Sequence, residues 1–299
     1  MTVTPFAMTG DRKSKMTMRL SRIERRLAEL IPSETSWPAQ LHSAERHALL
    51  SPGKRFRPLL CLLVAEGSAG NGVDALDVAC VSEMVHAASL ILDDLPCMDD
   101  ADLRRNRPTV HVAYSESTAI LSATALLNRA YGVLMRAPIT ADHRVELGEM
   151  LSYAVGSKGL IAGQIADLAN EDMSASDAEV ERLNTLKTGA LFDFSIDAGA
   201  LVGGATPAQR MALRDFSQVL GLAFQLLDDF LDLTAESGKS SHRDSGKATL
   251  VALDGEVAAR ERLGSYKADL MEALGRADLT TQREIAGIMD VYFDMASIA

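Results

Sequence analysis

Aromatic residues, cysteines and long apolar runs are all scarce in this sequence, and each scarcity excludes a class of protein. Only 5% of the 299 residues are aromatic, and the abundance of Ala and Leu favours helices over strands. Cys61, Cys80 and Cys97 have neither disulfide nor zinc-ligand spacing, so we interpret them as reduced thiols of a cytoplasmic protein. No apolar run approaches the roughly 20 residues that a membrane-spanning helix needs.

Positive charge is also in short supply overall. The formal net charge of −11 argues against a general nucleic-acid-binding surface. It still allows an anionic ligand, because a metal ion and a few local cations can reverse the sign of the charge within a cleft. The first residues are polar and basic without an apolar centre, so we expect a flexible tail at 1–18 rather than a secretory signal. We expect one domain over 19–299.

Helix signals follow one another along the chain, and we identify no alternating strand pattern. Ser176 and Glu179 match a capping box, Gly203 and Gly204 would end the helix that follows, and Thr206 would begin the next one. The sequence predicts an all-α fold. The expected helices cover 20–31, 40–50, 59–65, 73–95, 117–136, 141–156, 176–202, the stretch from 206 into 228–232, 255–274 and 280–296.

Two clusters of carboxylates follow directly after apolar helical runs. The first is Asp93, Asp94, Asp99, Asp100 and Asp102, and the second is Asp228, Asp229 and Asp232. Carboxylates are costly to bury unless they are paired or bind metal, and hard oxygen ligands favour magnesium together with phosphate groups. Pro96 should interrupt the first helix and allow Asp93 and Asp99 to reach one side. We predict that the clusters face each other across a cavity and hold magnesium; the alternative is a pair of solvated acidic helix ends.

Two cation-rich turns accompany the acidic clusters. The first turn contains Lys54, Arg55 and Arg57, and the second contains Arg104, Arg105 and Arg107. Positive charge at the start of a helix opposes the helix dipole, whereas a bound phosphate would explain it. His86 precedes Asp93 by two helical turns on nearly the same face, which favours a functional role over a purely structural one. A solvated basic turn is the alternative for the first group.

Taken together, these motifs resemble the trans-isoprenyl diphosphate synthases, specifically the bacterial geranylgeranyl diphosphate synthases of carotenoid pathways. The likeness extends over about 51–250 and rests on six separated motifs in the family order. A single Asp-rich motif would be weak support, because terpene cyclases also carry one. The motifs are Gly53 to Pro58, Glu83 to Leu90, Asp93 to Arg105, Lys187-Thr188, Phe224 to Asp229, and Gly238-Lys239 with Asp244, Lys247 and Thr249.

The resemblance implies a bundle of long helices around a deep central cavity, usually in a homodimer. It implies a magnesium-dependent prenyltransferase that condenses isopentenyl diphosphate with dimethylallyl, geranyl or farnesyl diphosphate to give geranylgeranyl diphosphate. The implied metal ligands are Asp93, Asp99, Asp228, Asp232 and Asp244, supported by Asp94 and Asp229. The implied contacts to the allylic diphosphate are Arg104, Lys187, Lys239 and Lys247. The implied isopentenyl diphosphate pocket is Gly53, Lys54, Arg57, His86 and Arg105. Thr188 and Gln225 match positions that stabilise the allylic cation.

The product length follows from the positions just before the first cluster. At 1.5 Å per residue, Ser89 and Ala88 lie about one turn, roughly 6–7.5 Å, below Asp93. Both are small, whereas short-product relatives commonly have an aromatic ring here. The extra residues Pro96 and Cys97 also resemble the pattern of geranylgeranyl-producing relatives. We therefore expect a twenty-carbon product.

Two departures and three alternatives accompany the resemblance. Asn106 stands where the family usually has glycine, and Asn tolerates a left-handed turn. The segment 240–243 differs from the acidic or glycine-containing segment of many relatives, which leaves the ligands of this expected lid open.

The alternatives are a farnesyl diphosphate synthase, a terpene cyclase and a non-catalytic partner subunit. Against the last, this chain retains both acidic clusters.

Overall fold

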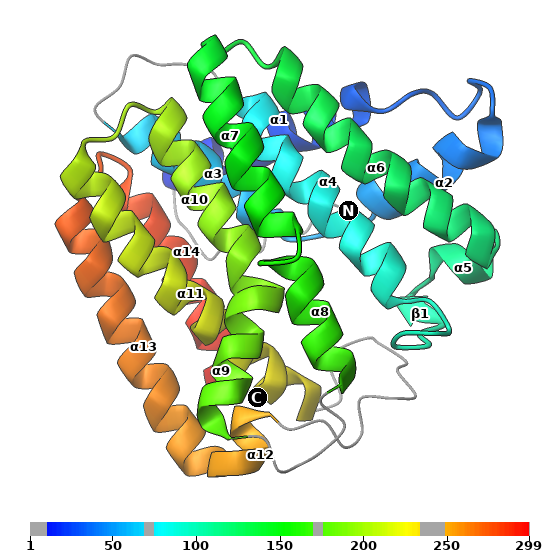
Figure 1. Cartoon of the computed structure of the whole chain (residues 1–299). Helices are drawn as coiled ribbons and strands as arrows, with labels where there is room; N and C mark the ends of the chain where they lie inside the picture. Colours follow the sequence, from blue (N-terminus) through cyan, green and yellow to red (C-terminus); the bar gives the residue numbers. More distant parts are fainter. Residues whose placement is uncertain (1–10, 69–74, 170–175, 234–248, 299) are drawn as a thin grey trace.

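The computed structural model describes residues 11–68, 75–169, 176–233 and 249–298. These residues form a bundle of helices with one very small hairpin (Figure 1). The predicted all-α fold class is confirmed. The elements are α1 (Asp11–Leu30), α2 (Ala39–Leu49), α3 (Phe56–Gly67), α4 (Leu76–Asp93), β1 (Leu103–Arg104), β2 (Arg107–Pro108), α5 (Val110–Ala113), α6 (Glu116–Arg136), α7 (Ala141–Val155), α8 (Leu160–Ala169), α9 (Asp177–Asn184), the π-helical turn η1 (Thr185–Gly189), α10 (Ala190–Val202), α11 (Pro207–Leu233), α12 (Leu250–Asp254), α13 (Glu256–Ala277) and α14 (Gln282–Ile298).

Helix α4 runs through the middle of the bundle and leads to the hairpin (Figure 1). It packs against α3, α6 and α10, while α11 packs against α10 and α13. Both α3 and α4 bury side chains on nearly every face, as a helix in the centre of a bundle must. Cys61 and Cys80 lie in this core as free thiols. None of the helices that the structure describes is long and apolar enough to cross a membrane.

The first helix begins earlier than the sequence indicated. We expected a tail over 1–18, but α1 begins at Asp11 and Met16 is fully buried, so that boundary is wrong. The reason is spacing: Met16 precedes the buried Ile23 by two helical turns and therefore lies on the same face. The polar composition of this stretch concealed the apolar stripe.

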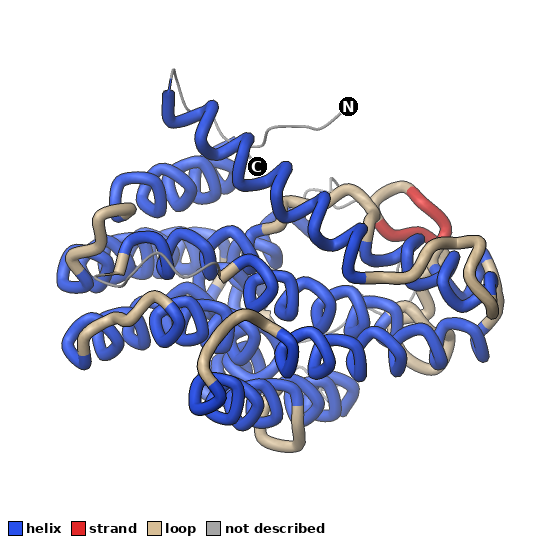
Figure 2. The backbone as a smooth tube through the Cα atoms, turned by 90° about the horizontal axis from the view of Figure 1, so that it is seen from above, coloured by secondary structure: helices blue, strands red, loops and turns tan. Residues whose placement is uncertain are grey.

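Several other features also differ from the expected elements. The helix expected over 176–202 contains the π-helical turn η1, and the helices α5, α8 and α12 were not expected. The hairpin β1–β2, drawn in red in Figure 2, follows the first acidic cluster where no strand was expected. The capping box of Ser176 and Glu179 is confirmed, and a reciprocal pair of bonds between Thr206 and Gln209 begins α11.

Candidate active site

The first acidic cluster lies where α4 ends. The helix ends at Asp93, and Pro96 lies in the irregular segment that follows. This segment turns back, because the Asp99 amide donates to the Asp93 carbonyl at 2.9 Å. The expected break at the proline is therefore present, and it brings Asp99 beside Asp93.

Asp93 is a carboxylate whose surroundings disfavour its charge. Burial raises the pKa of Asp93 to about 6; Lys187 opposes the shift and Asp99 adds to it. A desolvated carboxylate beside a second carboxylate needs a cation, and Lys187 supplies only part of that compensation. This environment would favour a bound divalent cation.

Asp94 has a different partner from its neighbour. Its Oδ1 accepts from Arg104 Nε at 2.7 Å, and Arg104 Nη2 lies at 2.6 Å from the same oxygen. Burial raises the pKa of Asp94, whereas this arginine lowers it. Asp94 thus holds Arg104 in place beside the acidic cluster, as expected of a residue that supports the metal ligands without being one of them.

The hairpin separates the paired arginines. Arg105 and Asn106 have φ values of 54° and 59°, so both occupy the left-handed region of a two-residue turn that suits Asn. Arg104 points to Asp94, while Arg105 Nη1 donates to the carbonyl of Pro52 at 2.8 Å. Two adjacent cations therefore serve different parts of the site.

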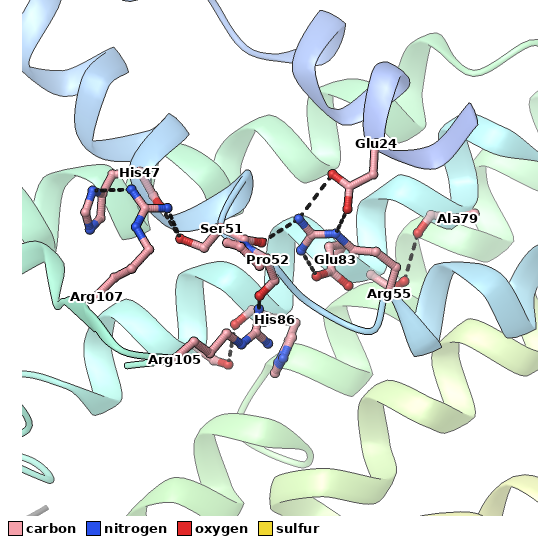
Figure 3. A network of polar contacts seen from close by, with 12 residues as sticks. Glu24, His47, Ser51, Pro52, Arg55, Ala79, Glu83, His86, Arg105 and Arg107 are labelled. Atoms are coloured by element: carbon pink, nitrogen blue, oxygen red, sulfur yellow. Dashed lines mark hydrogen bonds and ion pairs between the residues drawn. The ribbon is translucent and has the colours of Figure 1, made fainter. Parts of the chain in front are cut away.

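The turn before α3 contacts the Arg105 guanidinium. A Cβ at Gly53 would lie 2.5 Å from Arg105 Nη1, so glycine leaves room for this cation. Figure 3 shows Arg105 and His86 near this turn. Burial and then the neighbouring guanidinium groups, that of Arg57 first, hold the pKa of His86 well below its usual range. A neutral imidazole in a ring of cations can donate one hydrogen bond to an anion without adding charge.

Arg55 has a structural role that the sequence did not reveal. Its backbone is left-handed, with φ 48°, and its side chain bonds Glu24 Oε1 at 2.7 Å and Glu83 Oε1 at 2.6 Å (Figure 3). The two carboxylates join α1 and α4 to the turn and neutralise the guanidinium. No local spacing signals this contact, because both partners are remote in sequence.

Arg57 is compensated in another way. It is 8% exposed, and its guanidinium carbon lies 4.2 Å from the ring centroid of Phe192 and 5.6 Å from that of Phe224. Burial lowers the pKa of Arg57, yet aromatic faces attract the cation. Its Nε makes no hydrogen bond within the described part of the chain.

The π-helical turn η1 connects the two acidic clusters. Lys187 Nζ lies 2.6 Å from Asp167 Oδ2 and affects the pKa of Asp93. Thr188 Oγ1 donates to Gln225 Oε1 at 2.8 Å, and Gln225 Nε2 donates to Asp229 Oδ1 at 2.9 Å. Lys187 thus lies on the side of the first cluster and Thr188 on that of the second.

Helix α8 holds this turn by close backbone contact. A Cβ at Gly163 would lie 2.3 Å from the Lys187 amide nitrogen, so the two backbones touch where only glycine fits. The extra residue of a π-turn rotates the following side chains relative to a regular helix. Lys187 and Thr188 are directed in this way, and no sequence pattern indicated the turn.

Some of the predicted site residues lie wholly or partly outside the described part of the chain. Lys239, Asp244 and Lys247 lie outside the described residues. Asp232 lies in the last turn of α11, but its side chain is also outside them. Of the two product-length positions, Ala88 is fully buried, whereas Ser89 is half-buried and its Oγ donates to the His86 carbonyl at 2.9 Å.

The fit of magnesium can be judged from the donor set. In the described ranges, no three His, Cys, Asp or Glu side chains converge closely enough to hold a metal ion alone. Magnesium is usually held by one or two carboxylates together with substrate phosphates and water. Asp93 and Asp99 on one side and Asp228 on the other are oxygen donors of that kind. The residues therefore fit magnesium that arrives with a diphosphate.

The helical bundle is the all-α isoprenyl diphosphate synthase fold. Residues 38–289 match the polyprenyl synthetase family, and the chain belongs to that family. It is 46% identical over 253 residues to a geranylgeranyl diphosphate synthase of Pantoea ananas, an alignment that covers 83% of this chain and 82% of the relative. It is 40% identical to geranylgeranyl pyrophosphate synthase 4 of Arabidopsis thaliana, covering 90% of this chain and 74% of the relative.

Solved structures of similar proteins agree with this membership. A geranyltransferase from Helicobacter pylori, complexed with magnesium and isoprenyl diphosphate, has a TM-score of 0.86 at 32% identity and covers 96% of this chain and 99% of its own. An FPP/GFPP synthase from Zymomonas mobilis has a TM-score of 0.81 at 36% identity and covers 92% of this chain and 97% of its own.

Proposed function

We propose that this chain is a prenyltransferase that condenses isopentenyl diphosphate head-to-tail with an allylic diphosphate and forms geranylgeranyl diphosphate. The observation that carries the proposal is the separation of Arg104 from Arg105. One arginine lies against the acidic cluster and the other against the turn before α3. Two separate groups of cations suit two diphosphates, and the relatives named above support the assignment.

We assign the allylic diphosphate to the side of Asp93. Magnesium, bound with that diphosphate through Asp93, Asp99 and Asp228, would withdraw electrons from it and make it a better leaving group. Arg104 and Lys187 add fixed positive charge beside the carboxylates. The family resemblance adds four further positions to this allylic diphosphate and its metal: Lys239, Asp232, Asp244 and Lys247.

The second diphosphate, that of isopentenyl diphosphate, is assigned to Lys54, Arg57, His86 and Arg105 near Gly53. These groups hold its alkene towards the allylic carbon. The carbon–oxygen bond of the allylic diphosphate breaks, the alkene forms the new carbon–carbon bond, and a proton leaves the adjacent carbon for the departing diphosphate. We assign the stabilisation of the developing allylic cation to Thr188 and Gln225, whose hydroxyl and amide oxygen are joined by a hydrogen bond.

The first test is the substrate requirement of the isolated protein. Labelled isopentenyl diphosphate should enter a lipid product only when an allylic diphosphate and magnesium are present together. A terpene cyclase would instead convert the allylic diphosphate alone into a hydrocarbon or alcohol. A non-catalytic partner subunit would show no turnover. Either of those results would contradict the proposal.

Magnesium binding should depend on pH through Asp93. Because burial raises the pKa of Asp93 to about 6, protons compete with the metal below that pH. Affinity should therefore rise as the pH increases through about 6 and then level off. Calorimetric titration of magnesium with inorganic diphosphate, one pH unit below and one above this pKa, measures the change. The dependence should be smaller in Asp93→Asn; an identical dependence in both proteins would contradict this role.

Aromatic substitution at the product-length positions should shorten the product. A ring at position 88 or 89 would enter the path of the growing chain one turn below Asp93. Ala88 is fully buried, so Ala88→Phe also overpacks the helix and should lower stability by about 1–3 kcal/mol. Ser89→Phe, at a half-buried position, avoids part of that cost. Product chromatography should show a shift towards farnesyl diphosphate; unchanged geranylgeranyl diphosphate in both folded variants would contradict the proposed channel.

We further propose a homodimer of single-domain subunits, in the cytoplasm, whose product enters carotenoid formation. Apolar side chains on the outer face of α6 support self-association: Ile120 is 46%, Leu121 62% and Met135 46% exposed. Apolar surface grouped on one helix favours a protein partner over solvent.

A further inference from the structure

Tyr292 lies on the last helix, α14, far in sequence from every site motif, yet it reaches the second acidic cluster. It is 2% exposed. Its hydroxyl lies 3.5 Å from Asp228 Oδ1 and 3.4 Å from the carbonyl oxygen of Phe224. Its ring is stacked on that of Phe224, with centroids 4.8 Å apart and planes inclined by 13°. The hydroxyl therefore contacts a proposed metal ligand from the protein side.

The face of the same ring carries a cation. Lys54 Nζ lies 5.1 Å from the ring centroid of Tyr292, and Phe56 packs at 5.4 Å between centroids. Burial lowers the pKa of Lys54, while Asp228 raises it. Tyr292 thus contacts both Asp228, on the side of the proposed metal site, and Lys54, on the side of the proposed isopentenyl diphosphate pocket.

The turn before α3 compensates its cations in two different ways. Arg55 is held by Glu24 and Glu83 in direct ion pairs. Arg57 instead lies over the faces of Phe192 and Phe224, and Lys54 lies over the face of Tyr292. A carboxylate neutralises a cation and would repel a diphosphate, whereas an aromatic face attracts the cation and leaves its charge available.

We propose that Tyr292 is a positioning residue of this site: its ring orients the Lys54 ammonium, and its hydroxyl orients the Asp228 carboxylate. The ligand class is a diphosphate at Lys54, so the inference rests on the proposed function. It assigns to α14 a role that none of the motifs indicated.

Two substitutions separate the ring from the hydroxyl. Tyr292→Phe retains the ring and removes the hydroxyl, while Tyr292→Leu removes both. Phe293→Leu is the control, because Phe293 is the adjacent buried aromatic of α14; it lies under Lys267 and meets the Tyr292 ring edge-on, with centroids 6.2 Å apart. Thermal unfolding of the three variants gives the structural cost of each change.

Binding of isopentenyl diphosphate alone, without magnesium or allylic substrate, tests the ring by calorimetry. We expect Tyr292→Leu to weaken binding roughly tenfold, the effect of a lost desolvated cation–π contact. Tyr292→Phe and Phe293→Leu should bind within about twofold of wild type if the ring alone matters. Wild-type affinity in Tyr292→Leu, or equal losses in Tyr292→Leu and Phe293→Leu, would overturn the ring's role. Failure of the wild type to bind would reject the isopentenyl pocket itself, a separate result that overturns both.

The hydroxyl is tested by the magnesium dependence of thermal unfolding in the presence of inorganic diphosphate. Tyr292→Phe should need several-fold more magnesium than wild type for half of the maximal rise in melting temperature, because Asp228 loses a hydrogen-bond donor. Phe293→Leu should not change this concentration. An unchanged magnesium requirement in Tyr292→Phe would overturn the hydroxyl's role.

Discussion

Replacing Asp93 or Asp228 with alanine is expected to lower turnover by at least about 10³-fold, because each carboxylate is proposed to hold magnesium against the diphosphate and such charge stabilisation supplies several kcal/mol. The helical content should remain near that of wild type. Steady-state turnover at saturating magnesium, with circular dichroism of the same samples, measures both quantities.

The structure also predicts the direction in which Asp93→Ala changes the stability of the fold. The raised pKa of Asp93 means that the metal-free folded protein disfavours its charge above about pH 6. The variant should therefore unfold, without metal, at the same temperature as wild type or a higher one. Asp102→Ala is the matched control, because Asp102 belongs to the same cluster but is exposed. Near-normal turnover in Asp228→Ala would remove the second cluster from the mechanism.

Arg57→Ala and Arg104→Ala should weaken different substrates. Arg57→Ala is expected to raise the Michaelis constant for isopentenyl diphosphate by about 10- to 100-fold, the effect of losing a charged hydrogen bond to phosphate. Arg104→Ala should raise that for the allylic substrate instead, because this guanidinium lies against Asp94 at the acidic cluster. Initial rates with each substrate varied in turn give both constants.

The control for this pair addresses the carboxylate that Arg104 leaves behind. Asp94 would remain buried without its cation, which alone could disturb the site. The double variant Asp94→Asn with Arg104→Ala removes that charge and should retain the selective loss of allylic affinity. Equal effects of Arg57→Ala and Arg104→Ala on both substrates would contradict two separate pockets.

Much of the fold followed from short-range signals. The capping box at Ser176, the helix break near Pro96 and the left-handed turn at Asn106 each depend on a few neighbouring residues, and all three are present. The predicted start of α1 was wrong, because the burial of Met16 depends on tertiary packing that the polar composition of this stretch conceals. Sequence patterns therefore located most of the long helices better than the ends of those helices, although α8 was missed.

In the candidate site, too, the residues within motifs were predicted, whereas those that depend on remote contacts were not. Motif residues such as Asp93, Lys187 and Gln225 lie where η1 approaches the two acidic clusters. Arg55 and Tyr292 could not be assigned, because their roles arise from contacts with partners remote in the sequence. The π-turn was equally inaccessible, since it depends on the close backbone contact at Gly163.

The most direct test of the proposed function is chromatography of the product formed from isopentenyl diphosphate and dimethylallyl diphosphate with magnesium. The small side chains of Ser89 and Ala88, one turn below Asp93, predict successive condensations that stop at geranylgeranyl diphosphate, with shorter diphosphates present as intermediates. Accumulation of farnesyl diphosphate as the final product, under excess isopentenyl diphosphate, would contradict the proposed product length. Absence of any elongated diphosphate would contradict the assignment of the site itself.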